Sequence, residues 1–89
     1  MEFEWDSDKD AWTRRNRHIS FAWASRIFAG RVIERPDGRK DYGEARILAT
    51  VRVDHNILTV VFTVRNGKYR IISARLASRK ERSAWLSSE

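Results

Sequence analysis

The stretch that decides the expected fold is VVFTVRNGKYRIISARLASRKER, residues Val60–Arg82. Its Asn66-Gly67 pair supplies the two positive-φ positions of a tight type I′ turn, so an antiparallel strand is expected on each side. Further along, Ser78 and Glu81 stand at capping-box spacing, which predicts that a helix begins at about Ser78. The stretch therefore predicts a strand, a hairpin turn, a second strand and a helix in succession.

Arginines recur along this unit and give it positive charge. They are Arg65, Arg70, Arg75, Arg79 and Arg82. Arginine offers a planar fork of donors that binds phosphate or carboxylate bidentately. Such a set favours an anionic partner, and RNA is the first hypothesis. The alternative is that each arginine is ordinary solvated surface, as most charged residues are.

The N-terminal third predicts one strand and two helices. Alternation of polar and apolar side chains over residues 2–5 indicates a short strand with one buried face. Asp6 or Ser7 can cap a first helix that ends near Arg17 or His18. Ser20 can cap a second helix. The apolar stripe of this helix would consist of Phe21, Ala24, Ile27 and Phe28, and Gly30 would end it.

The middle of the chain predicts a loop and then an antiparallel meander. Residues 36–38 form a proline–glycine turn, and residues 37–44 are expected to be an exposed loop. The first meander strand has Ile47, Ala49, Val51 and Val53 on one face. Ile57–Arg65 is almost continuously apolar and should be central, followed by a strand over Tyr69–Leu76. The predicted class is α+β: a short N-terminal strand, two helices, an antiparallel β-meander of three to four strands and a C-terminal helix.

Composition bounds the kind of protein. Eighty-nine residues, 42% hydrophobic and 34% charged, suit one globular domain over residues 1–89. The chain has no cysteine, which suits a reducing cytoplasm and excludes disulfides and thiolate metal sites. No apolar run reaches the ~18 residues of a membrane span. The acidic start argues against a secretory signal peptide, so a cytoplasmic location without membrane contact is expected.

The net charge of +6 is unevenly distributed. Residues 1–10 hold five acidic side chains and one basic one, a net charge of −4, whereas the rest of the chain carries +10. Of the 18 lysine and arginine residues, 14 are arginine. This bias towards arginine favours phosphate or an acidic protein as the partner.

Several short motifs point to a known family. They are FEWD (Phe3–Asp6) with Lys9, then Ser20-Phe21, and RIISAR (Arg70–Arg75) followed by Ala77, Arg79 and Glu81-Arg82. In this order, and over nearly the whole chain, they resemble the BrnT toxins of bacterial type II toxin–antitoxin systems. The resemblance implies a RelE-like ribonuclease fold and inhibition of translation. It also implies neutralisation by a small DNA-binding antitoxin, BrnA, in complexes with more than one toxin copy.

The chain departs from the family pattern at three places. Relatives usually carry Lys-His-Gly before the Ser-Phe motif, where this chain reads TRRNRH up to His18. Without a gap, Arg17 takes the family histidine position and His18 the glycine; with a one-residue deletion, His18 is the family histidine. Val64 stands where relatives usually have glutamate, and Trp85 replaces a common tyrosine.

RNA cleavage without a metal needs a base for the 2′-hydroxyl proton, an acid for the leaving 5′-oxygen and cations for the phosphorane charge. The predicted catalytic residues are His18, Arg70 and Arg75. The predicted RNA phosphate ligands are Arg46, Arg65, Arg79 and Arg82. Arg70 and Arg75 lie five residues apart, so a regular strand places them on opposite faces, and they share a site only if the strand ends or bulges between them. For His18, the alternative is a surface or helix-capping histidine.

The expected partners are a BrnA-like antitoxin, RNA (including ribosome-associated mRNA) and a second toxin copy. No metal or other cofactor is expected, because the two histidines lack the spacing of metal ligands. A different class of function stays open: a non-catalytic interaction domain of the same fold that binds an acidic antitoxin or nucleic acid. A DNA-binding regulator is a weaker hypothesis, because no helix-turn-helix pair places a basic recognition helix.

Overall fold

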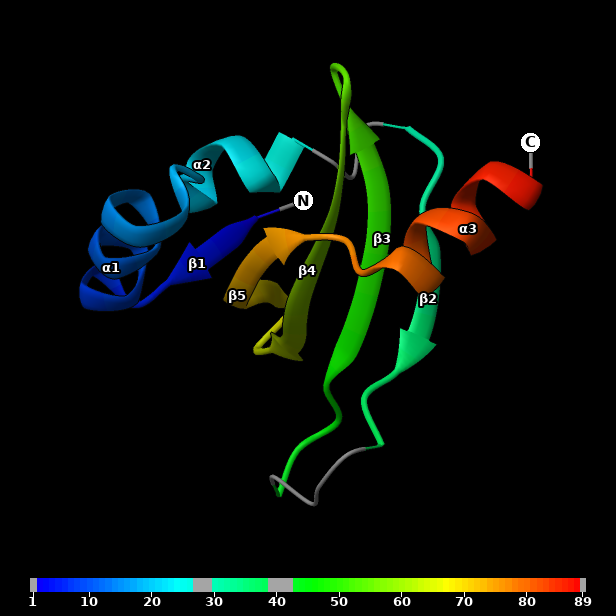
Figure 1. Cartoon of the computed structure of the whole chain (residues 1–89). Helices are drawn as coiled ribbons and strands as arrows, with labels where there is room; N and C mark the ends of the chain where they lie inside the picture. Colours follow the sequence, from blue (N-terminus) through cyan, green and yellow to red (C-terminus); the bar gives the residue numbers. More distant parts are fainter. Residues whose placement is uncertain (1, 27–29, 39–42, 89) are drawn as a thin grey trace.

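The computed structural model describes residues 2–26, 30–38 and 43–88. The elements in chain order are β1 (Phe3–Trp5), α1 (Ser7–Arg17), α2 (Phe21–Ala24), β2 (Ile33–Pro36), β3 (Ile47–Val53), β4 (Asn56–Arg65), β5 (Lys68–Leu76) and α3 (Arg79–Ser87). Figure 1 shows this arrangement of strands and helices. The predicted α+β class is confirmed for the described part of the chain.

One five-stranded sheet organises the molecule, with the strand order β1-β5-β4-β3-β2. The apolar strand β4 is central, as predicted. Strands β2 to β5 pair antiparallel in sequence order, whereas β1 pairs with β5 in parallel. The predicted antiparallel meander is therefore present, whereas the parallel pairing of β1 with β5 was not predicted. The sequence does not reveal β2, because Ile33–Pro36 is short, mostly exposed and ends in proline, so it shows no alternation.

The predicted helix caps are confirmed. The Asp6 side chain accepts a hydrogen bond from the backbone of Asp8 at the start of α1, and Ser20 does the same for α2. Ser78 and Glu81 form both bonds of a capping box at the start of α3. Each cap satisfies a backbone donor that the first helical turn leaves without a partner.

The predicted hairpin turn between β4 and β5 is also confirmed. Asn66 has a φ of 51° and Gly67 a φ of 75°, the two positive values that a type I′ turn requires. The expected loop at 37–44 differs in one respect. Asp37 is buried rather than exposed, and its backbone N–H donates to the carbonyl of Arg46 at 2.9 Å. This bond continues the β2–β3 pairing by one residue and draws Asp37 inward; residues 39–42 lie outside the described part.

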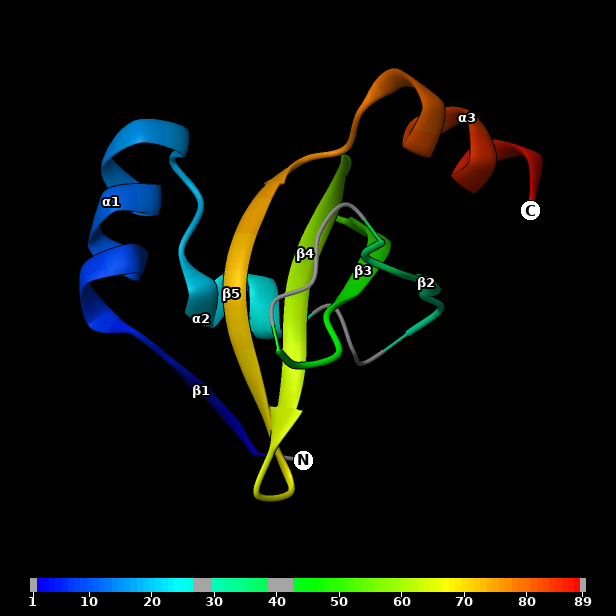
Figure 2. The ribbon, with the colours of Figure 1, turned by 90° about the horizontal axis from the view of Figure 1, so that it is seen from below.

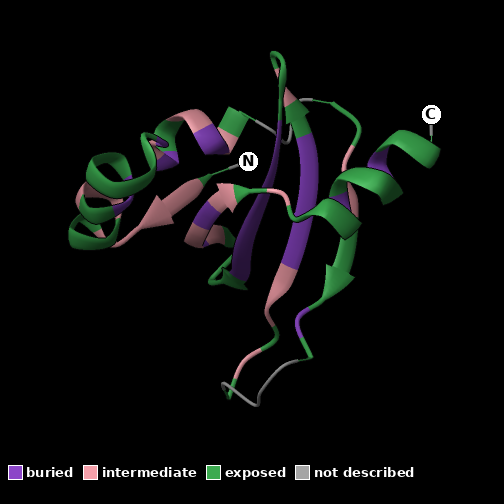
Figure 3. Ribbon diagram, in the orientation of Figure 1, coloured by how far each residue is buried: buried purple, intermediate pink, exposed green. Residues whose placement is uncertain are grey.

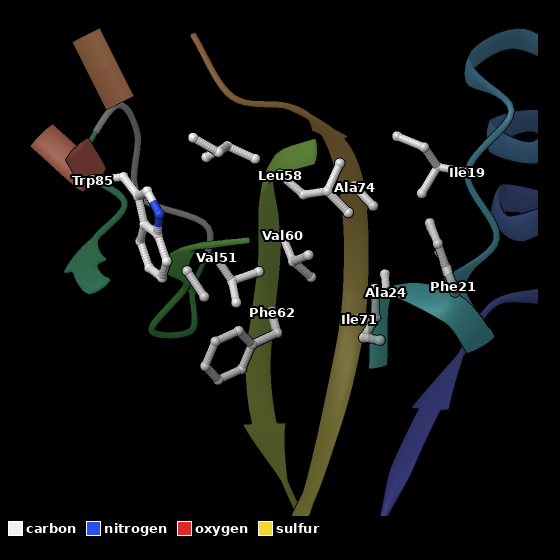
Figure 4. Packing of buried hydrophobic residues seen from close by; sticks show 12 residues of the cluster. Ile19, Phe21, Ala24, Val51, Leu58, Val60, Phe62, Ile71, Ala74 and Trp85 are labelled. Atoms are coloured by element: carbon white, nitrogen blue, oxygen red, sulfur yellow. The ribbon is translucent and has the colours of Figure 1, made fainter. Parts of the chain in front are cut away.

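The apolar core lies along β3, β4 and β5, where buried residues are concentrated (Figure 3). On β3, Ala49 and Val51 are buried, and Ile47 and Val53 pack against the same cluster, which confirms the predicted face. Figure 4 shows this cluster, with Ile19, Phe21 and Ala24 on one side of it and Trp85 on the other. Of the predicted stripe on the second helix, Ile27 and Phe28 lie outside the described residues.

The helices lie at opposite ends of the sheet. Helices α1 and α2 contact β5, whereas α3 contacts β3. Figures 1 and 2 both show α1 and α2 beside the β1–β5 end and α3 beside the β3–β2 end. No helix in residues 2–26, 30–38 and 43–88 has the length and apolar character needed to cross a membrane.

Candidate functional site

A β-bulge in β5 interrupts its pairing with β4. Val61 pairs with Ser73, but the next residue, Phe62, pairs with Ile71. Ile72 is therefore an extra residue on β5, opposite no residue of β4. Because side chains alternate between faces along a strand, one extra residue reverses which side chains of β5 point to which face.

The bulge brings Arg70 and Arg75 onto the same face of the sheet. Arg70 pairs with Thr63 and Arg75 with Thr59, and cross-strand partners share a face. Thr59 and Thr63 are four residues apart on β4, so they also share a face. The structure thus meets the condition under which these two arginines can serve one site.

The sheet face that carries Arg70 and Arg75 is rich in polar side chains, and we call it the arginine face. By strand register it includes buried Leu48 and Val61, and its polar members include Glu4, Arg35, Thr50, Thr59, Thr63, Arg65, Arg70, Ser73 and Arg75. The threonines at its centre are buried, and Thr50 and Thr59 share a hydrogen bond of 3.1 Å between their hydroxyls. Glu81 of α3 is hydrogen-bonded to Thr59 at this centre, and charged side chains of the sheet lie around it.

Arg70 is held by Glu4 and keeps donors available. The two residues are direct partners in the parallel β1–β5 ladder, and Arg70 Nη1 lies 2.9 Å from Glu4 Oε2. The side chains are 29% and 34% exposed. Among the interactions of the described residues, Arg70 uses this one nitrogen, so Nη2 and Nε can still donate. A guanidinium fixed in this way can bind a phosphate oxygen without losing its protein partner.

Arg75 has a different environment, because Glu81 occupies both of its terminal nitrogens. Arg75 Nη1 and Nη2 donate to the two Glu81 oxygens at 2.7 and 3.1 Å, and Arg35 pairs with the same carboxylate. Glu81 is 5% exposed in its side chain and also accepts from the Ser78 backbone at 2.8 Å. The structure therefore places Arg75 in a bond that fixes its orientation.

The Glu81 carboxylate is strongly acidic. Burial by itself would raise its pKa, but hydrogen bonds from Arg75, Ser78 and Thr59 outweigh burial and hold the pKa well below its usual range. The group is consequently ionised wherever the protein is folded near neutral pH. It acts as a fixed negative charge and not as a proton donor.

The predicted phosphate ligands fall into two groups. Arg65 lies on the arginine face and donates bidentately to Glu44, at 2.9 Å to each oxygen, and half-buried Arg46 immediately precedes β3. Arg79 and Arg82 lie on the exposed first turns of α3, and within the described part of the chain neither has a side-chain partner. The structure places Arg65, Arg70 and Arg75 on one face of the sheet, spread along the β4–β5 ladder, and leaves Arg79 and Arg82 on α3.

The structure does not bring His18 to the arginine face. It is the exposed C-cap of α1, with a left-handed φ of 58°. It lines a hollow of about 210 Å³ with Arg17, Ile19, Trp23, Asn56, Leu58 and Leu76. None of these residues belongs to the arginine face.

Sequence reasoning missed Glu4 as a site residue. Its position between Phe3 and Trp5 shows only that it points away from the core. Its partner follows from the parallel pairing of β1 with β5, a contact over 66 residues that no local pattern reveals. Within residues 2–26, 30–38 and 43–88, no three histidine, cysteine or acidic side chains are grouped so that they could hold a metal ion.

Comparison with known proteins adds the family. Residues 5–81 match the model of a family described as the ribonuclease toxin BrnT of a type II toxin–antitoxin system. No curated protein matches the chain. The matched region contains β5, which carries Arg70 and the bulge, its partner strand β4, and the capping box of α3. The match covers most of the chain and confirms the resemblance seen in its motifs: this protein belongs to the BrnT family of ribonuclease toxins from type II toxin–antitoxin systems.

Proposed function

We propose that the chain is a metal-independent endoribonuclease that blocks translation in the cytoplasm and is neutralised by a BrnA-like antitoxin. One observation carries the proposal: Arg70 is fixed by Glu4 on a polar sheet face and keeps free donors. Membership of the family supports the activity of a ribonuclease toxin. The RelE-like fold that the motifs imply is compatible with an active site on the face of the sheet. In this proposal, arginine provides the positive charge that a metal ion supplies in metal-dependent nucleases.

In this proposal Arg70 binds the scissile phosphate and stabilises the negative charge that grows on it. Glu4 is the nearest carboxylate, and it takes the proton from the attacking 2′-hydroxyl. The 2′-oxygen then bonds to phosphorus as the bond to the 5′-oxygen breaks, and water donates a proton to that leaving oxygen. The products are a 2′,3′-cyclic phosphate and a 5′-hydroxyl.

The remaining predicted residues are proposed to hold the RNA strand. Arg46 and Arg65 flank Arg70 at the same end of the sheet, while Arg79 and Arg82 extend the positive surface onto α3. Arg75, oriented by Glu81, contributes positive charge to the arginine face. His18 was predicted to be catalytic, but its hollow is separate from the arginine face, and this proposal gives it no step in cleavage.

The antitoxin is proposed to be acidic where it meets this surface, because the chain carries +10 outside its first ten residues. An antitoxin that covers the arginine face would block RNA by occupying the same donors. A second toxin copy in the complex is proposed from the family alone.

The test is cleavage of single-stranded RNA in the presence of EDTA, with wild type compared with Arg70→Ala. We expect wild type to cleave and Arg70→Ala to lose roughly 10²–10³ in rate, the usual cost of removing one preorganised donor. Arg70→Lys should recover part of the rate, because lysine keeps the charge but not the fork. Thermal melts should change little, since a partly exposed ion pair contributes about 1 kcal/mol or less.

Arg26→Ala is the matched control, because Arg26 is exposed beside α2 and has no described side-chain partner. It should cleave like wild type. Wild-type rates in a folded Arg70→Ala protein would refute the assignment of Arg70. Absence of cleavage by wild type, together with antitoxin binding, would favour the non-catalytic interaction domain.

A further inference from the structure

Trp12 is unusually open to solvent for a tryptophan. It is 48% exposed, whereas the other aromatic side chains in the described part of the chain are buried or half-buried. Leaving so much aromatic surface in water forgoes the burial energy that usually places tryptophan in a core. The exposed ring is therefore available to a partner.

Arg17 fixes one side of the Trp12 surroundings. Its guanidinium carbon lies 5.1 Å from the centre of the Trp12 ring, within cation–π range. Arg17 Nη1 also donates to the Ala74 carbonyl at 3.0 Å and lies 3.4 Å from Ser73 Oγ, both on β5. The ring is thus held beside the open edge of β5 by a side chain that is itself anchored there.

A hollow of about 210 Å³ adjoins the ring. It is lined by Lys9, Trp12, Thr13, Arg17, Ile72 and Ser73. Ser73 belongs to the arginine face, and Ile72 is the bulge residue, so the hollow begins where that face ends. A polymer that lies across the arginine face can continue into it over the edge of β5.

We propose that this hollow is a nucleobase subsite, in which one unpaired base of the bound RNA stacks on Trp12. Lys9 and Arg17 flank the ring and would face the phosphates on either side of that base. Aromatic stacking combined with nearby cations is how proteins hold single-stranded nucleic acid. The inference rests on the proposed RNA substrate and adds to it a contact that selects unpaired nucleotides.

The charged surroundings favour RNA over a protein side chain as the occupant. The hollow combines the aromatic surface of Trp12 with two cations among its six lining residues, the combination that suits a base and its flanking phosphates. The last turn of α1 also contains Arg15, which has no described side-chain partner. Positive charge on this scale attracts a phosphate backbone.

The experiment measures binding of a short single-stranded RNA with 2′-O-methyl groups, which cannot be cleaved through the 2′-hydroxyl. Trp12→Ala should weaken binding roughly 5- to 150-fold, the range for the loss of one stacked base. Trp12→Phe should recover most of the affinity. Val64→Ala is the matched control, because Val64 is 54% exposed beside the Asn66-Gly67 turn; its affinity should equal that of wild type.

A base-by-base series of abasic oligonucleotides then tests stacking directly. At one position, removal of the base should weaken binding to wild type but have no further effect on Trp12→Ala. Equal affinity of wild type and Trp12→Ala, or failure of wild type to bind, would overturn the inference. So would a Trp12→Ala variant that keeps its RNA affinity and loses the antitoxin, since the hollow would then bind protein. If removal of one base weakens binding only when Trp12 is present, but wild type does not cleave RNA, the subsite would stand and the proposed ribonuclease activity would be refuted.

Discussion

At the scale of single residues, Glu81 joins parts of the chain that are far apart in sequence. Its carboxylate receives bonds from Arg75 on β5, from Arg35 on β2 and from the backbone at the start of its own helix. Glu81 thus attaches α3 to the arginine face, whereas Trp85, one turn further on, packs in the apolar core. The sequence reveals the capping role of Glu81, because that spacing is local. It cannot reveal the two arginines, which arrive from other strands.

Glu81 should make stability depend on acid. Its pKa is lowered in the folded state, so its contribution is fully present above the unfolded pKa of about 4.5 and is lost as the pH falls through the folded value. We expect Glu81→Gln to lower the free energy of unfolding at pH 7 by about 2–3 kcal/mol, as for hydrogen bonds to a charged group. Thermal melts from pH 7 down to pH 3 measure this.

The variant should also lose part of the acid dependence, so that the melting curves of Glu81→Gln and wild type converge as the pH falls below about 4.5. Glu44→Gln is a control, since Glu44 pairs with the exposed end of Arg65 and should contribute less than about 1 kcal/mol. Parallel curves for Glu81→Gln and wild type at every pH would contradict the assignment.

The strand register shows which face of the sheet is affected by the replacement of the family glutamate by Val64. Val64 pairs with Tyr69, next to the pair Thr63–Arg70, and so lies on the face opposite to Arg70. The glutamate that relatives usually carry here would not lie on the arginine face. Its replacement therefore removes no carboxylate from beside Arg70, and Glu4 is the carboxylate that lies there.

At the scale of elements, the features fixed by local chemistry were predictable. The hairpin turn, the helix caps and the apolar central strand depend on residues within a few positions of each other. The parallel pairing of β1, the strand β2 and the bulge at Ile72 depend on the ladder between distant strands. A bulge changes the face of every later residue of β5, so Arg70 and Arg75 could not be assigned to one face from spacing alone.

The C-terminus of α1 bears on the two alternative alignments with relatives. Helix α1 continues without interruption to Arg17, and His18 has the positive φ that glycine adopts most readily. The ungapped alignment places His18 at the family glycine, and this backbone conformation favours it. In that case Arg17, bonded to the β5 backbone, stands at the position of the family histidine.

His18→Gly should therefore stabilise the protein. Relief of the left-handed strain, less the greater freedom of glycine in the unfolded chain, should gain about 0.5–1 kcal/mol. For a domain of this size that corresponds to a rise in Tm of roughly 2–8 °C. His18→Ala, which keeps the strain, is the control and should not raise Tm.

The same variant tests the predicted catalytic role of the histidine. Because His18 lies apart from Arg70, we expect His18→Gly to cleave RNA at close to the wild-type rate. A more stable protein that cleaves two orders of magnitude more slowly would instead support His18 as an acid or base.

At the scale of the whole molecule, acidic side chains near the N-terminus form ion pairs with basic side chains of the same chain and so neutralise part of the basic surface. Glu2 pairs with Lys68, Glu4 with Arg70 and Asp10 with Arg14. These pairs leave the positive field to residues without described side-chain partners, which include Arg15, Arg79, Lys80 and Arg82. The net charge that the sequence gives is therefore less informative than the positions of the arginines that stay unpaired.

RNA binding should depend steeply on salt, because each neutralised phosphate of a single strand releases counterions and contributes a slope of about −0.7 to log K against log[salt]. Contact with four to six phosphates predicts a total slope of about −3 to −4. Replacement of both Arg79 and Arg82 by glutamine should reduce its magnitude by about 1.4, if α3 carries part of the strand as proposed. Titrations of a fluorescent, cleavage-resistant oligonucleotide at several salt concentrations measure this. Arg26→Gln, an exposed arginine beside α2, is the control and should leave the slope unchanged. An unchanged slope in the Arg79/Arg82 double variant would remove α3 from the RNA path and confine binding to the sheet.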